Sequence, residues 1–104
     1  MTRAKMESLP TYENFVSQMN TTFHAGGDNG DVPLELAEIS NRKLTDRQEE
    51  FSITLRGPGD RLLGQGTRRF HHPQLGDFDL FIVPIRSDRD GCYYQAVFNF
   101  FKNA

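Results

Sequence analysis

Four arginines have the clearest chemical potential in the sequence, and they flank one turn that contains glycine and proline. Arg56 and Arg61 lie on either side of this turn, and Arg68 and Arg69 begin the next predicted strand. If the loop folds back as a hairpin, several guanidinium groups gather on one edge. There they can bind a carboxylate, a phosphate or an acidic patch on a partner protein. The alternative interpretation is a solubilising edge that prevents strand-to-strand aggregation.

The histidines and the cysteine give a weaker chemical signal. His71 and His72 are adjacent in a predicted strand, so their side chains point to opposite faces and cannot bind one ion there. No pair of residues has the short spacing of a zinc site. Cys92 with either histidine is the one candidate nucleophile pair, but a cysteine beside aromatic residues in a strand is typical of a small buried apolar side chain. The sequence therefore predicts no catalytic residue, no metal and no cofactor.

The composition is typical of a single globular domain, which we place at residues 1–104 with a flexible segment at 1–8. The net charge is −2, from 12 basic and 14 acidic side chains. Nucleic-acid-binding proteins normally have a basic excess, so this balance argues against nucleic acid as a partner. No segment approaches the ~20 apolar residues of a membrane span, and no apolar run typical of a signal peptide follows the N-terminus. We therefore expect a cytoplasmic protein with no membrane partner.

The elements that position these residues begin with a short helix. Thr11 is typical of a helix N-cap, and Tyr12, Phe15, Val16 and Met19 then recur at helical spacing as one apolar stripe. This stripe predicts a helix that packs on the core.

About six strands follow the helix, and glycine-bearing turns separate most of them. We expect a short strand around Phe23 and longer strands at residues 32–40, 51–56, 66–72, 78–85 and 92–101. The alternation of the first long strand slips near Ala37, which indicates a bulge or burial on both sides. Pro84 indicates a bulge, a strand end or an unpaired side. Residues 41–48 are interpreted as a polar connection, and 78–85, which is apolar on both faces, as a central strand.

These elements together predict an α+β fold. The turns are too short for the crossovers that parallel strands need, so neighbouring strands are expected to be antiparallel. The predicted architecture is a short N-terminal helix packed on a curved, mainly antiparallel sheet or a small open barrel of about six strands.

The C-terminal strand has more apolar side chains than one buried face needs. Its core face consists of Tyr94, Ala96, Phe98 and Phe100. On the opposite face we predict an interface that includes Tyr93, Val97 and Phe101, because Phe101 is exposed in a monomer unless something covers it. If this strand lies at a sheet edge, it can also accept a strand from a partner.

Several short motifs of the chain resemble a family of small, stand-alone bacterial proteins of uncharacterised function. The shared motifs are RGP at 56–58, QGT at 65–67, LG at 75–76, FIVPI at 81–85 and YQAVFN at 94–99. In such proteins a tyrosine or phenylalanine commonly follows the threonine of the second motif, whereas this chain has Arg68. The resemblance implies an association with genes for phage-tail-collar-type fibre proteins, and it implies no catalytic residues.

The function expected from the sequence is a non-catalytic cytoplasmic binding or assembly module. It would act through a sheet edge and the aromatic C-terminal strand, on a protein partner or a second copy of itself, and serve as an accessory to phage-tail-like fibre proteins. The alternative is a small-ligand-binding barrel or weak hydrolase, with a pocket that gathers Arg56, Arg69, His71 and Tyr93.

Overall fold

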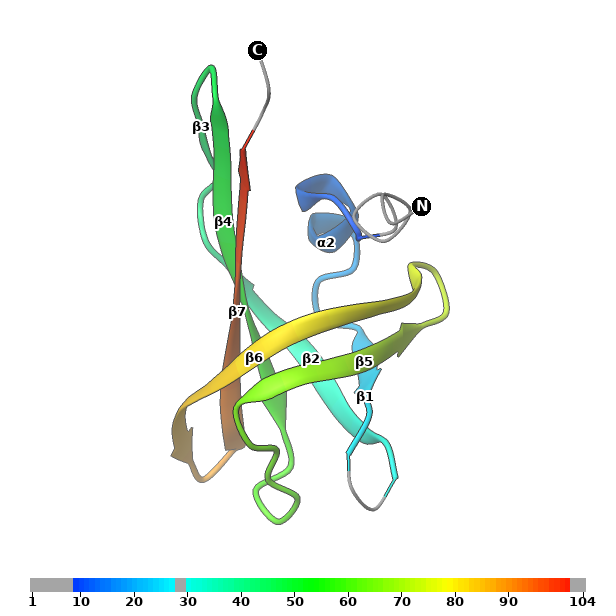
Figure 1. The fold of residues 1–104 in the computed structure, drawn as a ribbon. Helices are drawn as coiled ribbons and strands as arrows, with labels where there is room; N and C mark the ends of the chain where they lie inside the picture. Colours follow the sequence, from blue (N-terminus) through cyan, green and yellow to red (C-terminus); the bar gives the residue numbers. More distant parts are fainter. Residues whose placement is uncertain (1–8, 28–29, 102–104) are drawn as a thin grey trace.

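The computed structural model describes residues 9–27 and 30–101. The segment at 1–8, predicted to be flexible, lies outside these described residues. The described part of the chain forms one short helix and seven strands (Figure 1). In chain order they are α2 (Tyr12–Ser17), β1 (Thr22–Ala25), β2 (Val32–Ile39), β3 (Lys43–Leu44), β4 (Gln48–Gly57), β5 (Gly66–His72), β6 (Gly76–Asp88) and β7 (Gly91–Phe101).

Six of the strands close into a barrel. Neighbouring strands pair in the order β2-β1-β5-β6-β7-β4, and a further pairing between β2 and β4 completes the ring. Every pairing in the ring is antiparallel. The short strand β3 lies outside the ring, where it pairs with β4. Closure satisfies the backbone groups that an open sheet would leave unpaired at its edges.

This closed barrel corrects the predicted fold class. The α+β prediction was wrong, because α2 has only six residues and forms no layer of its own. The fold is all-β, with a closed ring in place of an open barrel or curved sheet. The pairing that closes the ring joins Leu36 of β2 to Leu55 of β4 and Ile39 to Ile53. Alternation of apolar residues indicates which face of a strand is buried, but it does not indicate which strands pair.

Alternate side chains of each strand fill the barrel. Phe51, Ile53 and Leu55 of β4 are buried, as their period of two predicted. Phe81 and Ile85, on the outer face of β6, are exposed. The barrel wall is a single layer of sheet, so its outer face meets solvent. Other fully buried side chains are Phe23, Leu34, Leu36, Phe70, Phe78, Ile82 and Tyr94.

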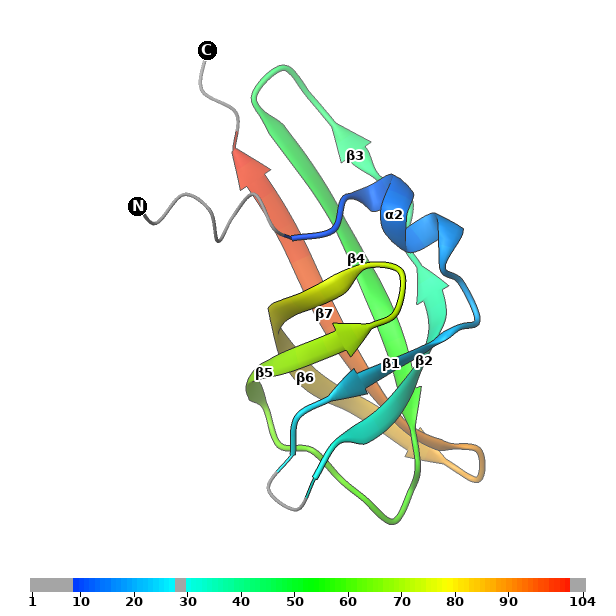
Figure 2. The same ribbon diagram turned by 90° about the vertical axis from the view of Figure 1, so that its right-hand side faces the viewer.

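Three strands continue past the barrel as a ribbon, which consists of β3, residues 48–52 of β4 and residues 96–101 of β7 (Figure 1). β4 pairs with β7 from Gly57↔Cys92 to Gln48↔Phe101. β6 pairs with β7 only over residues 91–95 of β7. Residues 96–101 of β7 therefore have β4 on one side and no paired strand on the other within the described part of the chain (Figure 2).

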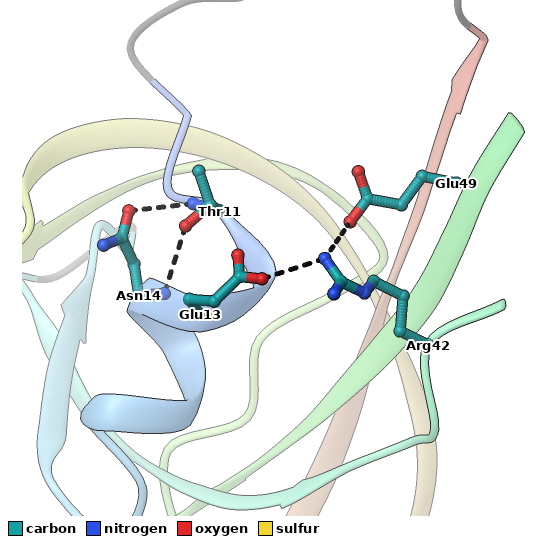
Figure 3. Close-up of polar contacts among 5 residues, drawn as sticks. All are labelled: Thr11, Glu13, Asn14, Arg42 and Glu49. Carbon is teal, nitrogen blue, oxygen red and sulfur yellow. Dashed lines mark hydrogen bonds and ion pairs between the residues drawn. The ribbon is translucent and has the colours of Figure 1, made fainter. Parts of the chain in front are cut away.

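Helix α2 packs against the ribbon and closes one end of the barrel. The Thr11 hydroxyl accepts a hydrogen bond from the Asn14 N–H at 3.1 Å, and the Asn14 side chain accepts one from the Thr11 N–H at 2.9 Å (Figure 3). This reciprocal capping confirms the predicted N-cap. Phe15 is fully buried, whereas Val16 is exposed, so only part of the predicted stripe faces the core. None of the described helical structure has the length and apolar character needed to cross a membrane.

Candidate functional site

The four arginines singled out from the sequence do not form one cluster. Arg56 forms an ion pair with Glu35 across β4 and β2. The charge of Glu35 and a hydrogen bond with Tyr93 raise the pKa of Arg56 above its ordinary value. Arg69 points outward from β5, and its Nε lies 3.2 Å from Oδ1 of Asp79. A carboxylate therefore neutralises each of these two arginines.

Arg61 and Arg68 do come together, at the end of the barrel opposite the ribbon. Both line a cavity of about 160 Å³ beside the 58–65 loop. Nη2 of Arg61 donates a hydrogen bond to the carbonyl oxygen of Asp31, at a distance of 3.0 Å. Arg68 donates to the carbonyls of Gly64 at 3.2 Å and Gly26 at 3.5 Å. The remaining lining residues are Gly27, Gly30, Val32, Leu62 and Leu63.

At this barrel mouth, the contacts of Arg61 and Arg68 within the described residues are to backbone carbonyls. In residues 9–27 and 30–101, no carboxylate forms an ion pair with Arg61 or Arg68. The Nε of Arg68 is buried without a hydrogen-bond acceptor. Taking a guanidinium partly out of water costs free energy unless its charge and its N–H groups are satisfied. The mouth is therefore a concave site that two cationic groups line, and Asp31 and Asp60 are the chain neighbours of lining residues Gly30 and Arg61.

A second cavity lies on the other side of the 58–65 loop. It has a volume of about 380 Å³ and a largely apolar lining that includes Leu62, Pro84 and Cys92. The hydroxyl of Tyr94 accepts a hydrogen bond from the Leu63 N–H at 3.0 Å, which fixes the loop between the two cavities. Cys92 is a free, buried thiol. Its apolar surroundings fit the interpretation of a small buried side chain.

The two adjacent histidines lie on opposite faces of β5. The Nδ1 of buried His72 accepts from the N–H groups of Gln74 at 3.0 Å and Leu75 at 3.3 Å, and its Nε2 lies 2.9 Å from the Thr21 hydroxyl. Burial lowers the pKa of His72, with a smaller contribution from the charge of His24. His71, on the outer face, hydrogen-bonds to Asp77 at 2.8 Å.

These positions do not support the ligand pocket that the sequence suggested for Arg56, Arg69, His71 and Tyr93. Arg69 and His71 lie on the outer face of β5, while Arg56 and Tyr93 face each other across β4 and β7. Within the described chain, no three His, Cys, Asp or Glu side chains group closely enough to bind a metal ion.

The predicted interface residues of β7 differ in exposure. Val97 is 61% exposed and Phe101 is 74% exposed, both on the outer face of the ribbon. Tyr93 is only 7% exposed, because the guanidinium of Arg86 lies 4.0 Å above the centre of its ring. Asn99 lies between Val97 and Phe101 on the same face and is paired with Glu50 of β4. Of the three predicted interface residues, the two exposed ones therefore lie in the ribbon.

One polar contact that sequence analysis missed joins the helix to the ribbon. Nη1 of Arg42 lies 3.0 Å from Glu13 of α2 and 3.2 Å from Glu49 of β4 (Figure 3). The hydrogen bond to Glu49 and the charge of Glu13 raise the pKa of Arg42. Its guanidinium also lies 4.8 Å from the centre of the Tyr12 ring. No local pattern signals this contact, because Glu13 lies far from Arg42 in the sequence.

The closed ring of six antiparallel strands places the chain among the small β-barrel proteins. The family model described as Domain of unknown function (DUF6916) matches residues 10–98, and the chain belongs to that family. The match extends from the residue before the helix cap to Phe98 of β7, and it agrees with the resemblance to a family of uncharacterised function. Comparisons with curated proteins and with solved structures gave no match.

Proposed function

We propose that this protein is a non-catalytic binding and assembly module that acts through the end of the ribbon. One observation carries the proposal. Among residues 9–27 and 30–101, no strand pairs with residues 96–101 of β7 on the side away from β4, and the same segment exposes Val97 and Phe101. A free backbone edge beside an apolar face is the combination that strand addition uses, because main-chain hydrogen bonds give affinity and side chains give specificity.

This edge lacks the features by which proteins usually block unwanted strand pairing. Exposed edges are commonly protected by charged side chains, proline or a bulge. Residues 96–101 contain no charged residue and no proline. The register shift between β6 and β7 lies at Pro84 and Arg86, which pair with Tyr94 and Tyr93 and so lie outside this segment. The edge is thus chemically suited to accept another strand.

A second copy of the same chain is the partner we favour. If two copies of β7 pair antiparallel about a two-fold axis at Asn99, Val97 of one copy faces Phe101 of the other. Directly opposed apolar residues stabilise an antiparallel pair, and the two Asn99 amides can hydrogen-bond to each other. The exposed face is therefore self-complementary in this register, as a symmetric dimer requires.

Sedimentation velocity over a range of concentrations tests the assembly. We expect a reversible dimer for the unmodified chain. Phe101→Glu should raise the dissociation constant of the dimer by about tenfold or more, because a carboxylate would be buried against Val97. Phe81→Glu is the matched control, since Phe81 is also exposed but lies on the barrel wall. A monomer at all concentrations, or equal weakening by both variants, contradicts the proposed self-association.

A disulfide experiment tests the register. In a Cys92→Ala background, Asn99→Cys should form an intermolecular disulfide on mild oxidation, because the two-fold axis brings residue 99 opposite itself. Val97→Cys should not form one, because residue 97 faces residue 101 of the other copy. Equal cross-linking of both variants would contradict pairing about Asn99.

The resemblance in sequence, taken alone, supports a further proposal about biological setting. In it, the module works in the cytoplasm as an accessory to phage-tail-like fibre proteins. Affinity purification of the tagged chain from its native host tests this: recovery of a fibre protein that is lost with Phe101→Glu is expected. If Phe101→Glu recovers the same amount of fibre protein as the unmodified chain, the fibre protein does not bind through the ribbon.

A further inference from the structure

We propose that the outer wall of the barrel binds a divalent transition-metal ion between His24 of β1 and His71 of β5. The two histidines are directly opposed in the antiparallel pairing of these strands, which lie side by side (Figure 1). The register thus pairs His71 with a histidine from a distant segment, whereas its chain neighbour His72 lies on the opposite face. This site goes beyond the assembly function, because the ribbon consists of parts of β3, β4 and β7 and contains neither His24 nor His71.

Both side chains project from the outer face of the wall. Each histidine lies between two buried residues of its own strand, and successive side chains of a strand point to opposite faces. The buried residues are Phe23 and Ala25 in β1, and Phe70 and His72 in β5. His24 is exposed, and the side chain of His71 is 45% exposed. Two imidazole rings therefore stand next to each other on one surface that solvent reaches.

The spacing of opposed residues suits one shared ion. Directly opposed residues of an antiparallel pair have Cβ atoms about 4.5–5.5 Å apart. From that spacing, two imidazole rings can each bring one nitrogen to an ion at the Zn–N distance of about 2.0–2.1 Å. Within the described residues, no third His, Cys, Asp or Glu side chain completes a group around the pair. Water would therefore fill the remaining positions around the ion.

Asp77 orients the His71 ring for this role. It is the cross-strand partner of His71 on β6, and its Oδ1 lies 2.8 Å from Nδ1 of His71. When Nδ1 carries the hydrogen that Asp77 accepts, the lone pair of the neutral ring is on Nε2. Strands β6 and β1 flank β5 on opposite sides, so a ring with Nδ1 turned toward Asp77 has Nε2 away from β6. Nε2 of His71 is thus the ligand atom, and Asp77 is a positioning residue.

This arrangement is the usual support of a metal-binding histidine. Such a histidine almost always donates its other ring N–H to a carboxylate, a backbone carbonyl or water, which fixes the tautomer and makes the ligand nitrogen more basic. Imidazole nitrogen suits Zn²⁺, Cu²⁺ and Ni²⁺, whereas Mg²⁺ and Ca²⁺ prefer oxygen ligands. The pair therefore selects a transition-metal ion over Mg²⁺ and Ca²⁺.

Zinc chloride, added to the full chain in a metal-free buffer that does not bind metals, is the probe. In NMR spectra of the histidine rings, Nε2 of His71 and one ring nitrogen of His24 should shift and saturate. The ring nitrogens of buried His72 should not. His24→Gln and His71→Gln should each abolish saturable zinc binding measured by calorimetry.

Two variants of β6 test the positioning role. Asp77→Asn should weaken zinc binding by about tenfold to a hundredfold, the usual cost of losing the partner of a metal-bound histidine. Asp79→Asn is the matched control. It removes the same charge from the same face of β6, where Asp79 pairs with Arg69, and it should bind zinc as the unmodified chain does.

Four outcomes would overturn the proposal. The first is an absence of saturable shifts in the rings of His24 and His71, and the second is unchanged zinc affinity in either glutamine variant. The third is equal zinc affinity of Asp77→Asn and Asp79→Asn, which would remove the positioning role and indicate general attraction to a charged surface. The fourth is binding of Mg²⁺ as tight as that of Zn²⁺. Because His24 and His71 are on the surface, their variants should keep the fold, which circular dichroism checks.

Discussion

The ring centre of Phe15 in α2 lies 5.3 Å from that of Phe98 in β7. This contact joins the helix to the strand that has the free edge. Phe98 in turn stacks on Phe51 of β4, with ring centres 4.7 Å apart and planes 12° apart. The inner face of the ribbon is therefore packed against the helix, while its outer face remains exposed. The helix thus supports the ribbon as well as closing the barrel.

Phe15→Ala should lower the free energy of unfolding by about 3–5 kcal/mol, the usual cost of removing a fully buried phenylalanine side chain. The reason is that Phe15 is fully buried and its ring contacts four other phenylalanine rings, all of which lose that contact. Urea denaturation followed by circular dichroism measures the change. Val16→Ala is the control, since Val16 is exposed, and it should change stability by less than about 0.5 kcal/mol. Similar losses for both variants would show that Phe15 does not anchor the helix.

Acid should destabilise the protein through His72. Burial lowers the pKa of His72 in the folded state, whereas an unfolded histidine has a pKa of about 6.5. As the pH falls through about 6.5 the unfolded chain binds a proton that the folded chain does not, so the free energy of unfolding falls. The slope from this one group is at most about 1.4 kcal/mol per pH unit, and it ends once the pH passes below the folded pKa.

Urea denaturation between pH 7.5 and 5 measures this effect. His72→Gln should be less stable than the unmodified chain at pH 7.5, because Nδ1 of His72 accepts two backbone hydrogen bonds, and its stability should depend less on pH. His71→Gln is the control at the exposed neighbour. If the pH dependence persists in His72→Gln and disappears in His71→Gln, the assignment to His72 is wrong.

Much of the local structure could be predicted from the sequence, because short-range patterns encode it. Thr11 caps the helix, Phe51, Ile53 and Leu55 alternate inward, and the register shifts near Ala37 and Pro84 occur where the pattern indicated irregularity. Each of these features depends on neighbours within a few residues.

Closure of the barrel could not be predicted in the same way, because it depends on the pairing of β2 with β4 across the β3 turn. One feature of the mouth could be predicted from the sequence. Arg68 lies two residues before Phe70, the one large apolar residue of β5, so both side chains are on the inner face of the strand. The position of Arg61 beside the same cavity as Arg68 could not be predicted, because it depends on the path of the 58–65 loop.

The turn between β6 and β7 requires glycine at position 91. Gly91 has φ of +139°, and a Cβ built there would lie 2.2 Å from the carbonyl oxygen of Gly57. Gly91→Ala should therefore lower the free energy of unfolding by about 2–4 kcal/mol, from backbone strain and displacement of β4. Thermal and urea denaturation measure this loss. In Gly59→Ala the new methyl group meets no atom within 4 Å, and we expect almost no change. Equal stability of the two variants would contradict the steric argument.

Tyr94 connects the core of the barrel to the loop that forms the mouth. Its hydroxyl is the acceptor for the Leu63 N–H at 3.0 Å, and its ring is almost fully buried. Tyr94→Phe keeps the ring but leaves that N–H without its acceptor, so the free energy of unfolding should fall by about 1–2 kcal/mol. The Leu63 amide should also exchange faster with solvent, because local opening of the loop no longer breaks a hydrogen bond.

Hydrogen exchange read by NMR separates this local effect from general destabilisation. Tyr12→Phe is the control, since Tyr12 packs its ring on Phe51 at the helix end of the barrel, and it should leave exchange at Leu63 unchanged. Leu63 also lines the mouth, so faster exchange at this amide would report movement of the loop that walls that cavity. Unchanged exchange at Leu63 in Tyr94→Phe would show that the loop keeps its path without the Tyr94 hydroxyl. The mouth would then depend on the contacts of Arg61 and Arg68 alone.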